Sequence, residues 1–405
     1  MVSAIPINLR GLLRPFGEHH RRVTFTELFF DLVYVFAIIQ LSHLLLEHLT
    51  WRGALQTFML FTAVWWSWIN TAWFANWFNP DKRPVRILMF GLMLSSLIMA
   101  ATLPEAFGDR GLACAIAYAA MEVGRSLFAF LALSEQPAMQ RNFQRILVWH
   151  SAVAVTAIAG GLADGGLRDT FWIVSVLLAN TGAIARFYVP GLGRSSLADW
   201  DSIVGGHLAE RCQLFLIIAL GESILIMGST FAGLDITFWV FFAFVSAFVG
   251  SVALWWIYFD RGADLAAERI NASPNPGALA RSVYTYAHAI MVAGVIVTAV
   301  GDELSIAHPT GDADIETVLV LAGGPAIFLL GHMLFKYLVW GIISPHRVAA
   351  IAALGVLIAI GTLLPPVAVA LISTGIALGV VAIDSGFLGL VTHPELEPQP
   401  VPEFE

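Results

Sequence analysis

Charge is scarce in this chain of 405 residues. Only 12% of the residues are Asp, Glu, Lys or Arg, whereas soluble domains carry about a quarter. Hydrophobic residues make up 58% of the chain and gather in long apolar runs. This composition excludes an ordinary soluble domain. It predicts an integral membrane protein with many spans, whose surroundings are the lipid bilayer.

Cysteine is almost absent, and so is any concentrated basic surface. The two cysteines, Cys114 and Cys212, both fall in apolar segments, so we expect no structural disulfide. No basic stripe is present, which argues against a nucleic-acid partner. The first residues lack the order of charge, apolar core and small-residue cleavage site that marks a leader. We therefore expect the N-terminal arm to be retained.

Familiar catalytic and cofactor motifs are also missing. The sequence has no phosphate-binding P-loop, no GxGxxG after a strand, no GxSxG elbow and no TVGYG filter. We therefore predict no cofactor, and we favour a protein that is not an enzyme, although the sequence leaves that question open.

Twelve apolar segments have the length of about 20 residues that a bilayer core requires. They lie at 24–46, 53–75, 85–103, 111–133, 143–163, 170–190, 205–230, 236–259, 282–302, 316–338, 347–364 and 366–384. The fold class is therefore an all-α polytopic membrane protein with about twelve transmembrane helices. The last two segments are joined by two prolines and could instead form a re-entrant hairpin.

The spans divide into two sets of six that resemble each other. VWWSWIN in the second span matches LWWIYFD in the eighth. Because six is even, both halves enter from the same side, which predicts a tandem parallel repeat. Shared use of aromatic residues at the membrane interface is the alternative explanation. The predicted parts are an arm (1–23), two halves (24–190 and 191–384) and an acidic, Pro-rich tail (385–405).

The positive charges predict the orientation in the membrane. With an internal N-terminus, sixteen of the 21 Lys and Arg residues fall on the cytoplasmic side and three on the other. Those three are Arg52, Arg110 and Arg168, and two more arginines lie within spans. This bias predicts that both termini are cytoplasmic.

Ten ionisable residues within the predicted spans are singled out as candidates, because a charge at the bilayer centre costs about 2.5–3.5 kcal/mol. They are Glu27, Asp31, Glu122, Arg125, His207, Glu210, Arg211, Glu222, His288 and His332. Such side chains face the interior of a helix bundle and need partners, so they are the candidate site residues.

Two carboxylates lie four residues apart at the start of the first span. Thr24 and Glu27 have the spacing of a capping box, and an acid in a first turn also suits the helix dipole. Glu27 therefore has a structural explanation as good as a functional one. Asp31 lies deeper in the helix and needs a cationic or hydrogen-bonding partner.

The seventh span offers partners for Asp31. His207 and Arg211 share a helix face, and Glu222 returns to the same stripe three turns later. Gly221 would permit close approach of another backbone. Glu210 points more sideways and could pair with Arg125 or an interfacial group. The alternative is that Glu210 and Arg211 both lie at the cytoplasmic boundary.

Two further sets complete the candidates. Glu122 and Arg125, three residues apart, are expected to form a structural ion pair. His288 and His332 fall at a depth similar to that of Asp31 and His207, so these four either share a site or are packing residues. Together they could make a zinc set, but no local ligand spacing supports one, and we predict no metal.

The segments ELFFDLVYVFA (27–37) and HLAER (207–211), the latter followed by LFLIIALGES (214–223), resemble the bacterial low temperature requirement protein A family. The resemblance covers residues 18–384. It implies a polytopic protein of the bacterial inner membrane that is linked by the family's name to growth in the cold, and it implies no defined activity. The family motifs map onto Glu27, Asp31, Gly221, Glu222 and the stretch 207–211.

Three functions follow as expectations. The first is a transporter or channel whose buried Asp, Glu, His and Arg residues handle protons, cations or a small solute. The second is a non-catalytic sensor or scaffold linked to growth under cold or stress. The third is an intramembrane enzyme acting on lipids. A weaker outline likeness to lysosomal potassium channels lacks their Arg before Phe30-Asp31. A homo-oligomer is left open.

Overall fold

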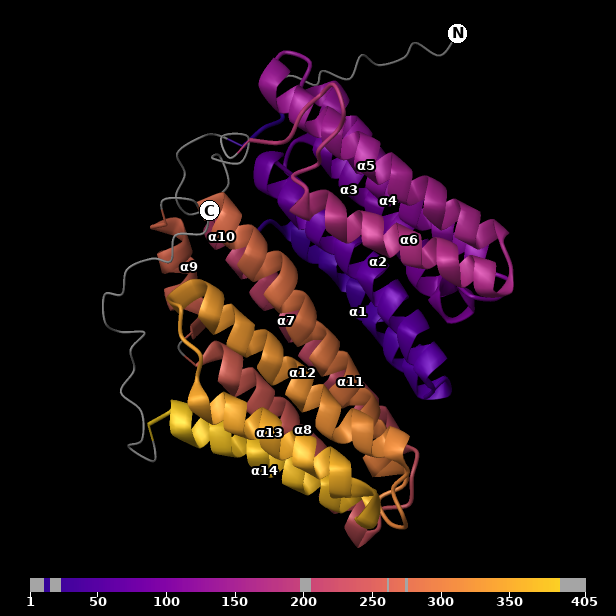
Figure 1. Ribbon diagram of the computed structural model, residues 1–405, viewed down its shortest axis with the longest axis vertical. Helices are drawn as coiled ribbons and strands as arrows, with labels where there is room; N and C mark the ends of the chain where they lie inside the picture. Colours follow the sequence, from indigo (N-terminus) through magenta and orange to yellow (C-terminus); the bar gives the residue numbers. More distant parts are fainter. Residues whose placement is uncertain (1–10, 15–22, 197–204, 261, 274–275, 387–405) are drawn as a thin grey trace. The chain divides into compact units, whose positions relative to one another are not determined.

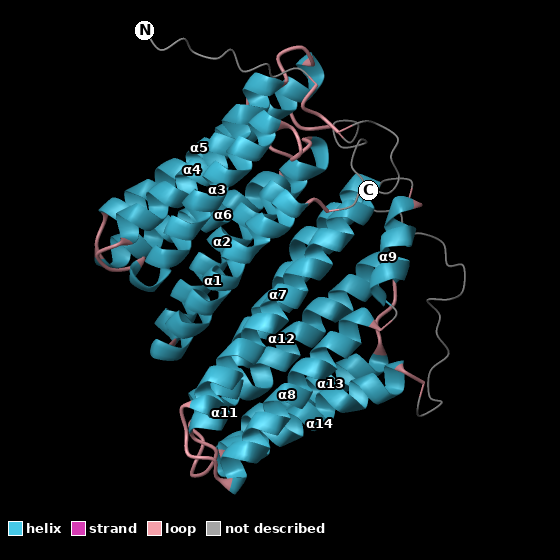
Figure 2. Ribbon diagram, turned by 180° about the vertical axis from the view of Figure 1, so that it is seen from behind, coloured by secondary structure: helices cyan, strands magenta, loops and turns pink. Residues whose placement is uncertain are grey.

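The computed structural model describes residues 11–14, 23–196, 205–260, 262–273 and 276–386. Within these ranges the regular elements are helices, and β pairing is limited to two isolated bridges (Figure 2). The all-α prediction is therefore confirmed for this part of the chain. Most of the predicted arm (1–23) and nearly all of the predicted tail (385–405) lie outside the described residues.

The helices group into two compact units. The first unit comprises residues 1–41 and 55–208, and the second comprises 42–54 and 209–405. The division therefore falls inside helices rather than in the loop near residue 190. The predicted halves and their tandem repeat stay predictions.

The first unit is built from six helices and a short 3₁₀ turn. They are α1 (Phe25–Glu47), α2 (Trp51–Trp77), α3 (Arg83–Thr102), η1 (Leu103–Glu105), α4 (Gly111–Ala132), α5 (Pro137–Leu162) and α6 (Gly165–Ile184). The last turns of α1 and the first residues of α2 belong to the second unit.

The second unit contains the remaining helices (Figure 1). They are α7 (Gly205–Ala232), α8 (Phe238–Phe259), α9 (Gly262–Asn271), α10 (Pro276–Ala280), the π-helical segment η3 (Arg281–Ala287), α11 (His288–Ala307), α12 (Ile315–Trp340), α13 (Pro345–Ile360), η4 (Gly361–Leu363) and α14 (Pro366–Asp384). The first four residues of α7 belong to the first unit.

Local sequence signals set several of the helix ends. Thr237 caps α8 through a hydrogen bond from Val240 N, and Asp314 caps α12 through one from Thr317 N. Helices α3, α5, α13 and α14 have proline in their first turn, where the missing N–H is not needed. Helix α12 ends at Gly341, whose φ of 71° suits glycine.

Glycines hold α11 and α12 together, and the two helices run side by side (Figure 1). A Cβ added to Gly294 would lie 2.4 Å from Phe328 N, and one added to Gly324 would lie 2.5 Å from Thr298 N. Contacts this close require residues without side chains. The glycines therefore permit the close contact on which this part of the second unit is built.

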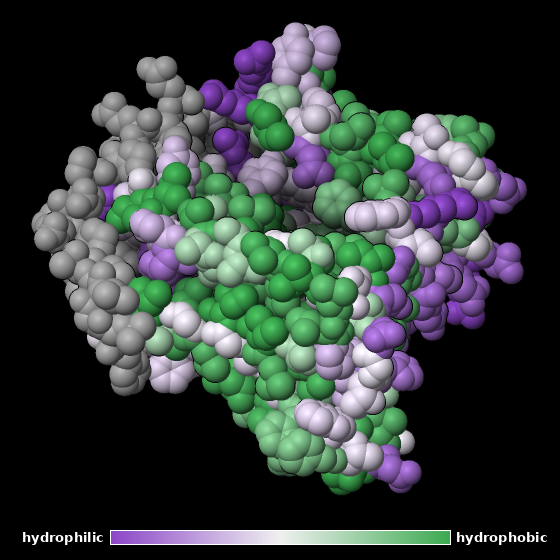
Figure 3. All heavy atoms as spheres, turned by 60° about the horizontal axis from the view of Figure 1, so that its bottom comes forward, coloured by the Kyte–Doolittle hydropathy of each residue, from purple (hydrophilic) through white to green (hydrophobic). Residues whose placement is uncertain are grey.

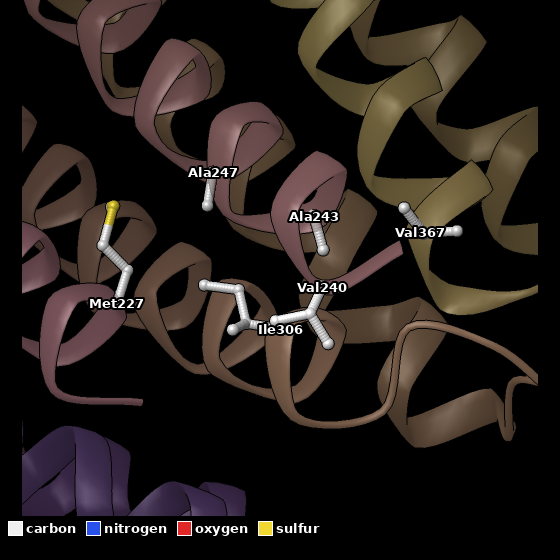
Figure 4. Close-up of a cluster of buried hydrophobic side chains, with 6 residues drawn as sticks. All are labelled: Met227, Val240, Ala243, Ala247, Ile306 and Val367. Atoms are coloured by element: carbon white, nitrogen blue, oxygen red, sulfur yellow. The ribbon is translucent and has the colours of Figure 1, made fainter. Parts of the chain in front are cut away.

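A hydrophobic cluster in the second unit joins α7, α8, α11 and α14 (Figure 4). Its buried members are Met227, Val240, Ala243, Ala247, Ile306 and Val367. Because they come from four helices, their packing fixes one end of this unit.

Ten helices among the described residues are long and apolar enough to cross a membrane. Helices α2 and α6 fill two of the predicted spans but are not among these ten. Tryptophan and amide residues in α2, and Arg168, Asp169 and Asn180 in α6, make these helices more polar. The predicted polytopic membrane fold is confirmed, and twelve spans stay a prediction. The last two predicted spans, 347–364 and 366–384, correspond to Pro345–Leu363 and Pro366–Asp384, which are both among the ten.

Large apolar side chains remain exposed along many helices, as expected for surfaces that face lipid. Examples are Leu162 at 68% exposed, Phe238 at 64% and Leu94 at 60%. The space-filling view shows hydrophobic residues over much of the visible face (Figure 3). These surfaces indicate a lipid bilayer environment.

Candidate functional site

Glu27 forms the expected capping box at the start of α1. Thr24 N and Thr24 Oγ1 donate to Glu27 Oε2 at 2.8 and 2.9 Å, and Glu27 N donates to Thr24 Oγ1 at 3.4 Å. The side chain satisfies free donors of the first turn.

Glu27 also belongs to a fully buried ion-pair network in the first unit. Arg14 Nη2 lies 3.0 Å from Glu27 Oε2, and His207 Nε2 lies 2.8 Å from Glu27 Oε1. Asn76 Nδ2 lies 3.4 Å from His207 Nδ1, and Arg14 Nη2 lies 3.4 Å from His207 Nε2. Arg14 also donates to the carbonyl of Ala75 at 2.8 Å. The network ties the N-terminal segment, α1, α2 and the first turn of α7 together.

Asp31, one turn further along α1, receives a hydrogen bond from α2. Trp68 Nε1 donates to Asp31 Oδ1 at 2.7 Å, and both side chains are buried. An indole N–H can only donate, so it suits a carboxylate acceptor. The expected pairing of Asp31 with Arg211 and Glu222 stays a prediction.

Glu122 and Arg125 lie in contact on α4, with Arg125 Nη2 at 2.7 Å from Glu122 Oε2. The same carboxylate oxygen receives Asn70 Nδ2 at 3.0 Å and lies 3.3 Å from His150 Nε2. Arg125 also donates to Thr71 Oγ1 at 3.0 Å. Three side chains therefore share the charge of one carboxylate, and Asn70 and His150 were not predicted as its partners.

Glu222 lies in α7 with 0% exposure. In the described part of the chain, neither of its carboxylate oxygens has a hydrogen-bond partner of ordinary geometry. The hydroxyl of Ser42 and the carboxylate of Glu303 are the polar groups that interact with it. An added Cβ at neighbouring Gly221 would meet nothing within 4 Å. The expected close backbone approach at Gly221 is therefore wrong.

Arg211 is fully buried on α7, and Glu210 beside it is partly exposed. Both side chains interact with neighbours. Their roles as charge-compensating groups stay predictions.

His288 and His332 meet around Tyr258 and Phe335 in the second unit. Tyr258 Oη lies 2.7 Å from His288 Nε2, while His288 Nδ1 lies 3.0 Å from the carbonyl of Val283. A carbonyl can only accept, so Nδ1 carries the hydrogen and Nε2 accepts from tyrosine. The ring centroids of His288 and His332 lie 5.5 and 5.8 Å from that of Phe335.

A charged network missed at the sequence level adjoins His332. Arg347 Nε donates to His332 Nδ1 at 3.2 Å, and Arg347 Nη2 donates to Asp384 Oδ2 at 2.5 Å. His346 Nε2 lies 2.9 Å from the other oxygen of Asp384. The sequence places an arginine and an aspartate at the two ends of the α13–α14 hairpin, and this pair of opposite charges was the signal that could have predicted the contact.

No metal centre emerges from the described residues. Within these ranges, no group of three or more His, Cys, Asp or Glu side chains is placed to hold a metal ion.

Apolar helices around buried, paired charges define a polytopic helical membrane protein. The family model of the bacterial low temperature requirement A protein matches residues 22–382. The chain belongs to this family, which confirms the resemblance in the two motifs. An uncharacterized protein of Rhizobium meliloti (strain 1021) is 40% identical over 377 residues, covering 92% of this chain and 90% of that protein. No solved structure matches the chain.

Proposed function

We propose that this membrane protein transports a proton, a small cation or a small solute across the bilayer, with Glu222 as a group that binds the moving species. The observation that carries the proposal is the burial of Glu222 in a spanning helix, where neither oxygen has a hydrogen-bond partner among the described residues. A carboxylate in this setting is costly. A transported species that binds to it would offset that cost.

The other buried glutamates provide the contrast. Glu27 and Glu122 are as buried as Glu222, but each contacts an arginine and a histidine. Their contacts support a structural role, as removing one partner of such a pair is strongly destabilising. The environment of Glu222 is that of a carboxyl group that binds and releases the transported species.

The remaining candidates have secondary roles in this proposal. Within the second unit, Arg211 compensates charge, and Glu210, His288 and His332 contribute polar groups. Within the first unit, Asp31 is a second group for the moving species, and His207 compensates charge. We place the protein in the bacterial inner membrane with both termini in the cytoplasm, as the distribution of basic residues favours.

The test is reconstitution into liposomes, with fluxes of protons, Na⁺, K⁺ and small solutes measured separately. We expect Glu222→Gln to reduce the flux by roughly 100-fold, the loss typical of removing a positioned proton-transfer group. The matched control is Glu316→Gln, because Glu316 is exposed in the first turn of α12. Wild-type protein that moves none of these species would refute the proposal.

A non-catalytic sensor or scaffold is the second candidate, and the closed networks favour it. The Arg14–Glu27–His207 and Arg347–Asp384 contacts join segments far apart in the chain. A bundle held in this way could report on the state of the bilayer. This candidate predicts no flux in liposomes and a dependence of protein stability on lipid composition.

A further inference from the structure

We propose that Glu222 binds a proton and that Glu303 and His43 carry protons between Glu222 and the surface of the second unit. The inference rests on the proposed transport function, because it names the transported species and its route at the same site. Neither His43 nor Glu303 stands out in the sequence as a buried charge.

Three ionisable groups, His43, Glu303 and Glu222, form a series of decreasing exposure. His43 in α1 is exposed, Glu303 near the end of α11 is partly exposed, and Glu222 is 0% exposed. Leu45 of α1 packs against Val300 of α11, so the end of α1 that carries His43 lies beside the end of α11 that carries Glu303. The charges of His43 and Glu303 interact, as do those of Glu303 and Glu222. The series therefore links a surface imidazole to a buried carboxylate through one intermediate group. All of these residues belong to the second unit.

Ser42 provides the independent sign of a ligand. Its side chain is 1% exposed, its hydroxyl interacts with Glu222, and its oxygen has no hydrogen-bond partner of ordinary geometry among the described residues. A buried hydroxyl in this position can donate to the carbonyl-type oxygen of a protonated carboxyl group, or to a carboxylate. It thus fits both states of a group that gains and loses a proton.

The surroundings favour a proton over a larger ion. Glu222 and Glu303 are carboxyl groups whose charges interact, and a proton on either one removes their repulsion. The apolar residues Leu45, Val300 and Val320 pack between the end of α1, α11 and α12. A dehydrated metal ion needs several oxygen ligands. In the described part of the chain, no set of acidic, His and Cys side chains is placed to supply them.

The transfer conserves charge and atoms at each step. The O–H bond of protonated Glu303 breaks as an O–H bond forms on the Glu222 carboxylate, which leaves Glu303 ionised. The imidazolium of His43 then returns a proton to Glu303, and His43 takes a new proton from water at the surface. Release toward the surface reverses these steps.

Infrared spectroscopy of purified protein tests proton binding without measuring transport. We expect a carboxylic acid C=O band that Glu222→Gln removes and that Glu316→Gln leaves in place. Ser42→Ala should shift this band, because the hydroxyl no longer donates to the carboxyl group. If Glu222→Gln fails to fold, the shift of the band in Ser42→Ala still tests whether Glu222 binds a proton.

Proton flux in liposomes tests the route. We expect Glu303→Gln and His43→Ala to reduce the flux about tenfold or more, while both keep the infrared band of Glu222. The matched controls are Glu316→Gln and His308→Ala, which change exposed residues in the first turn of α12 and just after the end of α11. Flux equal to that of wild type in Glu303→Gln and His43→Ala would overturn the route.

Two outcomes separate this inference from the proposed function. If Na⁺ or another solute moves in a Glu222-dependent way and the infrared band is absent, the proton assignment fails while transport stands. If Glu222→Gln and Ser42→Ala change the band but no species moves, Glu222 binds a proton and the transport function fails.

Discussion

Arg347 at the start of α13 donates to both carboxylate oxygens of Asp384, the last residue of α14, at 3.2 Å from Nη1 and 2.5 Å from Nη2. The arginine side chain is 1% exposed and the aspartate side chain 19%. A bidentate pair of this kind fixes both distance and orientation. It therefore closes the free ends of the α13–α14 hairpin against each other, and His332 of α12 joins it through Arg347.

We predict that Asp384→Asn lowers the free energy of unfolding by about 2 kcal/mol, because it leaves the Arg347 guanidinium buried beside a neutral amide. Thermal unfolding of the purified protein in detergent measures the change. Asp312→Asn, in an exposed loop, is the control. The double variant Arg347→Met with Asp384→Leu should recover most of the loss, since an apolar pair avoids an uncompensated charge. An unchanged melting temperature in Asp384→Asn would show that the pair is not structural.

We predict that Gly324→Ala destabilises the protein by about 1–3 kcal/mol, the range for overpacking a tight contact. The added Cβ would lie 2.5 Å from both the backbone nitrogen and the hydroxyl oxygen of Thr298, so α11 and α12 must separate. The neighbouring Gly323→Ala is a closely matched control, because its Cβ would meet nothing within 4 Å. Thermal unfolding of the two variants in parallel checks this. Equal melting temperatures would contradict the proposed glycine contact.

We predict that Trp68→Phe destabilises the first unit by about 1–3 kcal/mol, because it removes the indole donor of a buried carboxylate. The Trp68–Asp31 hydrogen bond of 2.7 Å is the interaction lost. Trp51→Phe, at a position 83% exposed, controls for the loss of a tryptophan. Asp31→Asn should relieve part of the defect when combined with Trp68→Phe, since a neutral amide needs the donor less. If the changes in unfolding free energy of Trp68→Phe and Asp31→Asn simply add in the double variant, the two side chains do not interact and the prediction fails.

Local spacing in the sequence was enough to predict some contacts. Thr24 and Glu27 lie three residues apart, as do Glu122 and Arg125, and a helix brings such residues onto neighbouring positions whatever surrounds it. The existence and type of the long apolar helices follow from the same local physics. These features required no knowledge of which helices are neighbours.

The other partners could not be predicted, because helical periodicity gives the direction of a side chain but not the helix that it meets. Glu27 contacts Arg14 and His207, which lie 13 residues before it and 180 after it. Asp31 was expected to need a cationic or hydrogen-bonding partner, and the structure supplies an indole N–H from Trp68, which the sequence did not identify. Which helices become neighbours depends on packing along their whole lengths.

The Glu27 network offers a direct measure of such a long-range contact. We predict a coupling free energy of about 1–3 kcal/mol between Glu27 and His207 in a double-mutant cycle of Glu27→Gln and His207→Gln. The two side chains are 0% exposed and 2.8 Å apart, so each single variant leaves a buried polar group with a changed partner.

Glu47→Gln is the matched control in this cycle, because it changes an exposed glutamate at the other end of α1. Its combination with His207→Gln should give a coupling free energy near zero. Thermal or denaturant unfolding of the four proteins in each cycle supplies the values. A Glu27–His207 coupling as small as that of the control would mean that the capping box alone accounts for Glu27. A large coupling would show that the first turn of α7 is anchored to the start of α1 by this one carboxylate, with Arg14 completing the charge balance.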